Sequence, residues 1–255
     1  MKADQLNVRM AWAAIATLLG VGSLVAQSPP SDSQKSGAAG KHLFILAGQS
    51  NMTDGLKAGF TKIVDQAFTR ENVTIAHQCK PGRGIRFWDK DFKYPAGFQF
   101  ADQSKPSNND KQHGELYPPL LETILTATKG NSYGSVTLVW MQGESDGLRG
   151  LGDAYEPSFL RLLERLKSDL NRKDIHFVIG RISDANMDQP GWIKVREVQK
   201  KLAEDHEHCG WIDTDDLNGG EAGKPGGDLH YPKDQIGIVG ERLATKAVEL
   251  IQKNP

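Results

Sequence analysis

Residues 42–48 read HLFILAG, a continuous apolar run of strand length. Four more runs of this kind follow along the chain: NVTIAHQ (72–78), SVTLVWMQ (135–142), IHFVIGRI (175–182) and CGWIDT (209–214). Continuous apolar runs rich in Val, Ile and Thr are typical of strands that are buried on both faces of a sheet. The sequence therefore predicts five buried strands.

Amphipathic helices are predicted between and after these strands. Apolar side chains recur at helical spacing in three sets: Phe159, Leu162, Leu163, Leu166 and Leu170; Ile193, Val195, Val198 and Leu202; and Ile236, Val239, Leu243, Ala247, Leu250 and Ile251. Each set gives a helix one apolar stripe. Strands that alternate with such helices indicate crossover connections and a largely parallel sheet. We expect an α/β fold, a three-layer α/β/α sandwich with a five-stranded, mainly parallel sheet.

The composition excludes several classes of protein. The chain has 255 residues, with 31 Lys and Arg against 32 Asp and Glu, and a formal net charge of −1. A protein that binds nucleic acid or an anionic membrane surface needs a basic excess, which is absent here. With 38% hydrophobic and 25% charged residues, the chain is also unlike a disordered or polytopic membrane protein.

The first residues have the pattern of a secretory signal peptide. Lys2 and Arg9 precede an uncharged, Ala-rich run over residues 10–26, and such a segment is normally removed on export. A retained membrane anchor is the alternative, although this run is at the short end of the spanning range. We predict a signal peptide at 1–26, a Ser-, Pro- and Gly-rich linker at 27–40, a folded domain at 41–255, and a secreted or periplasmic location.

Small and polar residues follow the predicted strands. In strand order they are GQSNM (48–52), PGRG (81–84), QGESD (142–146), Arg181 with Ser183 and Asp184, and Asp213 with Asp215 and Asp216. Ligands of parallel sheets bind outside the carboxyl ends of the strands, so these segments are expected to form the site. Ser50 suits a nucleophile on a strand-to-helix turn. From the residues alone, Ser50 or Asn51 as a helix N-cap stays an open alternative.

Three segments together resemble a known family. ILAGQSNM (45–52) resembles the nucleophile block of the SGNH hydrolases, in their sialate O-acetylesterase and carbohydrate esterase family 6 branch, VWMQGESD (139–146) resembles that branch's third block, and GDLHYP (227–232) resembles its last. The blocks occur in the right order. The resemblance implies a flavodoxin-like fold of the SGNH type over residues 41–252.

Residue by residue, the resemblance implies a catalytic triad. Ser50 would attack an ester carbonyl, His230 would take its proton, and Asp228 would orient His230. A His two residues after an Asp in an extended segment has its side chain on the same side of the chain. Many SGNH enzymes place this Asp three residues before the His, where Gly227 stands here. Glu144 or Asp215 is therefore the alternative acid.

The resemblance also implies an oxyanion hole, with the Ser50 amide and the side chain of Gln142 as donors. The second block departs from the family pattern, because PGRG stands where a GGT-like turn is usual. Pro81 has no N–H to donate. Gly82 is therefore the expected backbone donor, with Gly84 as the alternative, and Arg83 and Asn51 are candidate substrate or supporting residues.

The resemblance implies an esterase that removes acetyl groups from carbohydrates, sialate or acetylated polysaccharide, through an acyl-enzyme. A broader esterase, lipase or thioesterase and a non-catalytic carbohydrate-binding protein remain alternatives. The expected partner is an acetylated carbohydrate, with no nucleic acid, no membrane after signal cleavage, no cofactor and no metal. HEHC (206–209) is interpreted as a polar helix end.

The sequence also predicts the conformation of a long polar segment and the state of the two cysteines. Residues 89–118 form a long polar and aromatic segment that is predicted to be a loop. Its aromatic side chains either stack on a sugar ring or pin the loop to the body: Phe92, Tyr94, Phe98, Phe100 and Tyr117. Cys79 and Cys209 are expected on opposite edges of the sheet and hence as free thiols.

Overall fold

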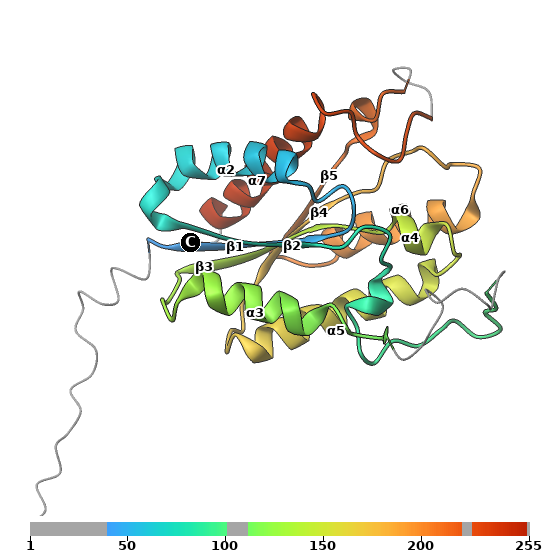
Figure 1. The fold of residues 1–255 in the computed structure, drawn as a ribbon, viewed down its shortest axis with the longest axis horizontal. Coiled ribbons are helices and arrows are strands. Elements are labelled where there is room, and N and C mark those ends of the chain that lie inside the picture. The colour runs from blue at the N-terminus through green and yellow to red at the C-terminus, as the bar shows by residue number, and fades with distance from the viewer. Residues whose placement is uncertain (1–39, 101–111, 221–225, 254–255) are drawn as a thin grey trace, which may run out of the picture.

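The computed structural model describes residues 40–100, 112–220 and 226–253 (Figure 1). Its sheet has five strands in the order β2-β1-β3-β4-β5, and every neighbouring pair is parallel. The strands are β1 (His42–Gly48), β2 (Val73–Cys79), β3 (Ser135–Met141), β4 (His176–Gly180) and β5 (Cys209–Ile212). The five predicted strands and the parallel sheet are confirmed, with boundaries that differ by at most two residues.

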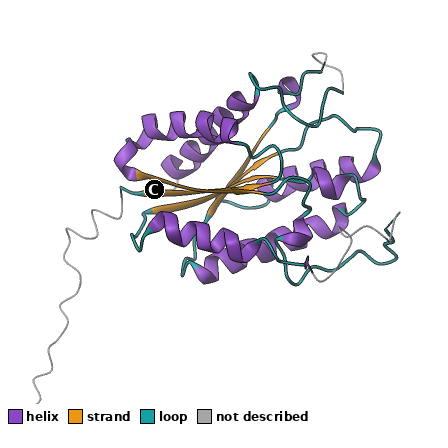
Figure 2. Cartoon of the chain, in the orientation of Figure 1, coloured by secondary structure: helices purple, strands orange, loops and turns teal. Residues whose placement is uncertain are grey.

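Helices cover both faces of this sheet, as the side view in Figure 2 shows. Their bounds are α2 (Asp54–Phe68), α3 (Tyr117–Thr128), α4 (Glu144–Gly147), α5 (Gly152–Asp169), α6 (Pro190–Glu204) and α7 (Ile236–Lys253), with short 3₁₀ turns at η1 (Arg70–Asn72), η2 (Ile85–Phe87) and η5 (Asp215–Leu217). Helices α2 and α7 lie on one face, and α3, α5 and α6 lie on the other. The predicted three-layer sandwich is confirmed.

Each face of the sheet has its own apolar core. Side chains of β1 alternate between the two, so that Leu43 and Ile45 pack with α3 and α5 while Phe44 and Leu46 pack with α2 and α7. All seven residues of β1 are buried. This double burial is the reason that the central strands are apolar without alternation.

Helix α2, which follows the predicted nucleophile block, lies unusually close to α7. A methyl group added at Gly59 would come 2.0 Å from the carbonyl oxygen of Gly237, and one at Gly240 would come 2.0 Å from that of Leu56. Real side chains do not tolerate such distances, so glycine at these two positions allows the two helix backbones to meet.

Several smaller expectations are also settled. Cys79 and Cys209 are free, at the two edge strands β2 and β5. The predicted loop is shorter than expected, because Tyr117 and Pro118 already belong to α3, in whose first turn proline is tolerated. None of the helices in the described ranges is long and apolar enough to cross a membrane. The predicted signal peptide, and the linker up to residue 39, lie outside the described residues.

Candidate active site

Ser50 lies on a tight turn directly after β1. The backbone amide of Gln49 donates to the Met141 carbonyl at 2.9 Å, so the turn begins against the end of β3. A methyl group at Gly48 would come 2.0 Å from that same carbonyl oxygen, so the two strand ends meet only with glycine there. The N-cap of α2 is Thr53, whose hydroxyl accepts from the Leu56 amide at 3.2 Å. The capping alternative for Ser50 and Asn51 is therefore wrong, because Thr53 fills that role.

His230 lies beside the Ser50 hydroxyl. Its Nε2 is 2.9 Å from the Ser50 Oγ, although the two residues are 180 positions apart in the chain. When Nε2 carries no proton, it accepts the hydroxyl hydrogen of Ser50, which is the contact that activates a serine nucleophile. Ser50 is partly exposed and His230 is exposed, so a substrate can reach both side chains.

The acidic residues near this pair are placed differently from one another. Asp228 accepts a hydrogen bond from the backbone amide of His230 at 3.1 Å. This is the local Asx turn that Asp often forms with the residue two positions on, and it replaces the extended conformation that we expected. In the described part of the chain, no hydrogen bond joins the Asp228 carboxylate to the His230 ring.

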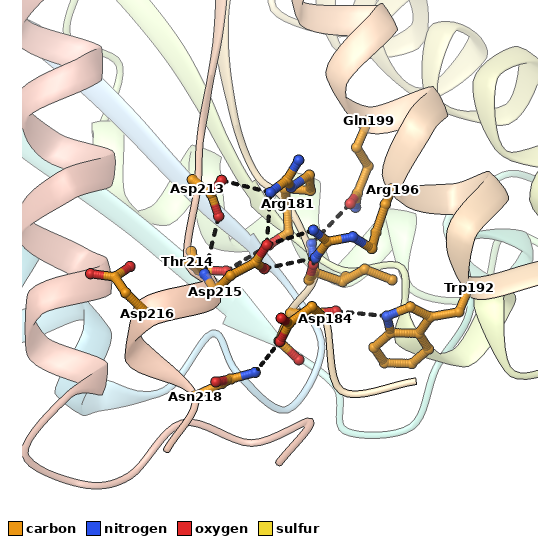
Figure 3. Close-up of polar contacts among 12 residues, drawn as sticks. Arg181, Asp184, Trp192, Arg196, Gln199, Asp213, Thr214, Asp215, Asp216 and Asn218 are labelled. Carbon is orange, nitrogen blue, oxygen red and sulfur yellow. Dashed lines mark hydrogen bonds and ion pairs between the residues drawn. The ribbon is translucent and has the colours of Figure 1, made fainter. Parts of the chain in front are cut away.

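The two alternative acids have other partners. Glu144 Oε1 accepts from the Asn51 side chain at 2.7 Å. Asp215 receives two hydrogen bonds from Arg196, at 2.8 and 2.7 Å, and one from Arg181 at 2.9 Å, as Figure 3 shows. Neither carboxylate contacts His230 within the residues that the structure describes, so Asp228 is the acid that the fold brings next to the base.

Buried polar side chains lie beneath the nucleophile turn. We call Gln49, Asn51, Gln142, Glu144 and Asp146 the amide network, and each of its members is at most 3% exposed. Gln142 Nε2 donates to Asp146 Oδ2 at 2.5 Å and to Gln49 Oε1 at 3.2 Å. The side-chain amide that we expected in the oxyanion hole is thus engaged inside the protein, and no contact joins it to Ser50 among the described residues.

The network contains two carboxyl groups with raised pKa values, so they lose their protons at a higher pH than ordinary carboxyl groups do. Burial raises the pKa of Glu144 to about 7, against the opposing effect of hydrogen bonds from backbone amides and Asn51. Burial likewise raises the pKa of Asp146 to about 6, and hydrogen bonds from Gln142 and the Ile85 amide oppose the rise. Desolvation disfavours the charged carboxylate, so a fraction of both groups is protonated near neutral pH.

The PGRG segment lies next to the nucleophile turn. The Lys80 amide donates to the Gly48 carbonyl at 3.0 Å, and the Ser145 hydroxyl donates to the Gly82 carbonyl at 3.0 Å. In the described ranges the amides of Ser50 and Gly82 donate to no acceptor, so both are available to a ligand. Gly84 is buried, and a methyl group there would come 2.8 Å from Asp146.

Arg83, the candidate substrate contact, already has two neighbours. Its guanidinium lies 4.6 Å from the centre of the Phe87 ring, and its Nε is 4.0 Å from Glu115. It is half-buried, so part of the side chain remains open to solvent. Its carbonyl accepts from Gln142 at 3.4 Å, so the backbone of this residue belongs to the support of the site.

The aromatic side chains of the long loop pack against one another. Tyr94 and Phe98 are stacked with ring centres 5.2 Å apart, and Phe92 and Phe100 contact Tyr94 edge-on. Tyr117 is buried in α3 and donates to Asp169 at 2.7 Å. Phe92 belongs to the apolar core on the α3 and α5 face, and Tyr94 and Phe98 pack against it, which supports the role of pinning the loop to the body. Residues 101–111 of this loop lie outside the described part.

The HEHC segment, interpreted from the sequence as a polar helix end, lies just beyond the last residue of α6. Its last residue, Cys209, begins β5. In the described ranges there is no group of three or more His, Cys, Asp or Glu that could hold a metal.

One buried side chain of the site was not predicted from the sequence. Asn218, 1% exposed after β5, donates to the Gly226 carbonyl at 2.6 Å in the segment that leads to His230. The sequence signal that could have indicated Asn218 is its position shortly after the polar segment 213–216, because Asp213 and Asp215 were already expected at the site.

Comparison with known proteins places this geometry in a family. The family model described as carbohydrate esterase, sialic acid-specific acetylesterase, matches residues 55–249, a range that contains Gln142, Glu144 and His230 and begins just after Ser50. No curated protein matches the sequence.

Solved structures share the fold at low sequence identity. A protein from Arabidopsis thaliana is 17% identical with a TM-score of 0.59, and the match covers 82% of this chain and 98% of that one. A carbohydrate acetylesterase from Xanthomonas citri is 15% identical with a TM-score of 0.57, covering 83% of this chain and 57% of that one. A carbohydrate esterase of family 3 from Talaromyces cellulolyticus is 10% identical with a TM-score of 0.52, covering 84% and 100%.

The fold of these structures is the α/β/α sandwich seen here, as the resemblance to SGNH hydrolases implied. The family match spans most of the chain and includes the residues of its last two blocks. The chain therefore belongs to the sialic acid-specific acetylesterase family of carbohydrate esterases and is a carboxylic ester hydrolase of the SGNH fold.

Proposed function

We propose that this protein removes acetyl groups from O-acetylated carbohydrates, sialate or acetylated polysaccharide, with Ser50, His230 and Asp228 as its catalytic triad. The single observation that carries the proposal is the 2.9 Å contact between Ser50 Oγ and His230 Nε2. Family membership supports the acetylated carbohydrate as substrate.

In the first half of the reaction, Ser50 Oγ attacks the acetyl carbonyl carbon while His230 Nε2 takes the hydroxyl proton. The negative charge that develops on the carbonyl oxygen is stabilised by the free amides of Ser50 and Gly82. The bond from carbon to the sugar oxygen then breaks, and the sugar alcohol leaves with the proton from His230. Ser50 is left as an acetyl ester.

In the second half, a water molecule loses a proton to His230 and attacks this acetyl ester. Collapse of the second tetrahedral intermediate returns the proton to Ser50 Oγ and releases acetate. Asp228 is the acid of this proposal, because Glu144 and Asp215 have their own partners elsewhere. Gln142 supports the turn through Gln49 and Asp146, and Asn51 links Glu144 to the loop of His230.

The test compares acetate release by the wild type and by Ser50→Ala. The substrates are p-nitrophenyl acetate, p-nitrophenyl esters of longer acyl chains, and a panel of O-acetylated sialates and polysaccharides. We expect turnover of acetyl esters by the wild type, and a loss on the order of 10⁴-fold or more in the variant. The Ser50 hydroxyl bonds only His230 among the described residues, so the variant should stay folded.

Other outcomes point to the alternatives. Efficient cleavage of long acyl esters would favour a broader esterase, lipase or thioesterase. Binding of the glycans without acetate release, by a folded wild-type protein, would contradict the catalytic proposal and favour a carbohydrate-binding protein.

We further propose that the protein is exported from the cytoplasm and that its signal peptide is cleaved after residue 26. The mature chain then starts with the linker at 27–40, and its folded domain begins at residue 41. The pattern of charge and hydropathy at residues 1–26 supports this proposal. Mass spectrometry of the mature N-terminus, from protein expressed with its own first residues, tests it. An N-terminus at Met1 in protein retained with the cells would contradict it.

A further inference from the structure

The segment that carries His230 belongs to no strand or helix, and polar contacts hold it together with the packing of Leu229 and Tyr231 against the two apolar cores. We call residues 226–231 the His230 loop, and most of its residues are exposed or half-buried. Its backbone receives hydrogen bonds from three side chains of other elements: Asn51, Ser183 and Asn218. The position of the base therefore depends on a small set of side chains rather than on a strand or a helix.

Asn51 makes the first of these contacts. Its Nδ2 donates to the Leu229 carbonyl at 2.9 Å and to Glu144 Oε1 at 2.7 Å. One amide group next to the nucleophile thus joins a buried carboxyl group to the residue that precedes His230.

Asn218 repeats this arrangement at the other end of the loop. Its Nδ2 donates to the Gly226 carbonyl at 2.6 Å and to Asp184 Oδ1 at 2.6 Å, the latter drawn in Figure 3. Its backbone carbonyl accepts from the Asp228 amide at 3.0 Å. Its Oδ1 accepts from the Gly220 amide at 3.1 Å. Asn218 therefore contacts the loop at two of the four residues that lead up to His230.

The chemistry of these partners requires an asparagine at position 218. A carboxylate and a carbonyl can only accept, so the group that faces both must donate, while the Gly220 amide requires an acceptor. Asp184 thereby sets the orientation of the Asn218 amide. Aspartate would offer the same shape without a donor and would place two carboxylates in contact.

Asp184 is itself anchored to the body of the protein. The Trp192 indole donates to the Ser183 carbonyl at 2.6 Å, and Arg196 donates to the Ile182 carbonyl at 2.5 Å, so α6 holds the segment after β4 (Figure 3). Asp184 is 9% exposed and Asn218 is 1% exposed. A continuous series of contacts runs from α6 through Asp184 and Asn218 to the His230 loop.

We propose that Asn218 and Asp184 are positioning residues, which hold the His230 loop so that Nε2 stays within reach of the Ser50 hydroxyl. This inference rests on the proposed function, in which His230 is the base. Neither side chain touches the Ser50 and His230 pair, so both act through the backbone of the loop. Displacement of a catalytic group by about 1 Å is enough to cost on the order of 10²-fold in rate.

The test measures kcat and KM on p-nitrophenyl acetate for the wild type, Asn218→Asp and Asp184→Asn. A fluorophosphonate probe supplies a second readout: Ser50 Oγ bonds to phosphorus, fluoride leaves, and His230 takes the proton. Asn218→Asp should lower kcat and the labelling rate on the order of 10²-fold, with KM within about twofold. Asp184→Asn keeps an oxygen acceptor and should lose no more than about fivefold.

Controls separate positioning from a loss of folding. Asn131→Asp removes a comparable contact, an amide that donates to the Thr128 carbonyl at 2.9 Å near α3, and should leave both rates unchanged. Asn218→Asp combined with His230→Ala should be no slower than His230→Ala alone, because the loop then has no base to position. Thermal unfolding of each variant shows whether it is folded.

Two results would overturn the inference while the proposed function stands. The first is a folded Asn218→Asp with wild-type kcat and labelling rate. The second is an equal loss from Asn218→Asp in the presence and absence of His230. A folded wild type that neither hydrolyses the ester nor reacts with the probe would instead contradict the proposed function, and the inference with it.

Discussion

The two halves of the candidate site are held in different ways. Ser50 follows β1, an interior strand of the sheet, next to an amide network whose members are at most 3% exposed. His230 is exposed on the loop at 226–231, which side-chain amides and hydroxyls of other elements hold. Core packing and buried polar groups thus hold the nucleophile. The base lies on an exposed loop that hydrogen bonds from other elements hold in addition to the packing of Leu229 and Tyr231.

This difference predicts where activity and stability separate. A change on the nucleophile side disturbs close-packed strand ends and buried polar groups, so it should lower the free energy of unfolding. Replacement of His230 or Asp228 alters an exposed side chain, so it should lower the rate and leave the protein folded. The predictions below test this comparison.

The largest expected effect is that of His230→Ala. Removal of the base should lower kcat for p-nitrophenyl acetate on the order of 10⁴-fold. The midpoint of thermal unfolding should stay unchanged, because His230 is exposed and its ring bonds only Ser50 among the described residues. His206→Ala is the matched control, because His206 is exposed and precedes β5, at the end of the strand opposite the site. A loss of kcat smaller than about tenfold in this variant would exclude His230 as the base.

Gly48→Ala should have the next largest effect, which is a loss of stability rather than a direct loss of catalytic rate. The new methyl group would meet the Met141 carbonyl oxygen at 2.0 Å, so the ends of β1 and β3 must separate. We expect the free energy of unfolding to fall by about 3 kcal/mol or more, measured by urea denaturation. Gly237→Ala in α7 is the control, since its methyl group meets nothing within 4 Å. Equal stability of the two variants would show that the nucleophile turn is not rigidly packed.

Asp228→Asn should reduce activity without a loss of stability. The Asn oxygen can still accept from the His230 amide, as the Asp oxygen does at 3.1 Å, so the Asx turn remains. The substitution removes only the negative charge of Asp228, which in our proposal stabilises the His230 imidazolium, so we expect kcat to fall on the order of 10²-fold. Asp188→Asn, at an exposed position, is the control. Unchanged kcat would limit Asp228 to the turn and leave His230 without an acidic partner.

Glu144→Gln should change how stability depends on pH. The folded protein holds the Glu144 proton up to about pH 7, whereas the unfolded chain releases it near its ordinary pKa of 4.5. Because the folded state binds more protons in this window, wild-type stability falls as pH rises from about 4.5 to 7, and then levels off.

Glutamine cannot titrate and keeps the oxygen that accepts from Asn51. The decrease in unfolding free energy between about pH 5 and pH 8 should therefore be smaller in Glu144→Gln, by about 2 kcal/mol. Asp146, whose pKa is also raised by burial, acts in the same direction in both proteins, and its charge adds to the raised pKa of Glu144. Glu122→Gln, at an exposed position on α3, is the control. If the unfolding free energies of the wild type and of Glu144→Gln change with pH in parallel, the raised pKa of Glu144 is contradicted.

Local patterns were enough to predict much of the fold. The five apolar runs became the five strands, and the three apolar stripes became α5, α6 and α7. Helices α2 and α3 were not identified individually. In α2 only Leu56, Phe60 and Val64 are buried, and α3 begins with two prolines that resemble the end of a loop.

The site was predictable in its parts but not in its contacts. Ser50, His230 and Asp228 were expected from the resemblance of short motifs. The structure places the His230 ring at the Ser50 hydroxyl and the Asp228 carboxylate at the backbone amide of His230. Gln142 was predicted to face the oxyanion, yet its amide donates to Asp146 and Gln49. A motif fixes which residue is present, whereas the direction of an amide depends on the acceptors that the fold places around it.

The sequence by itself determined the strand and helix pattern, because burial on two faces or along one stripe is written in the spacing of apolar residues. It also determined the order of the motifs that carry Ser50 and His230. Only the tertiary structure decided that a side chain after β4 and one after β5, Asp184 and Asn218, hold the loop of the base. Such contacts join residues far apart in the chain, and no local spacing encodes which donor will meet which acceptor.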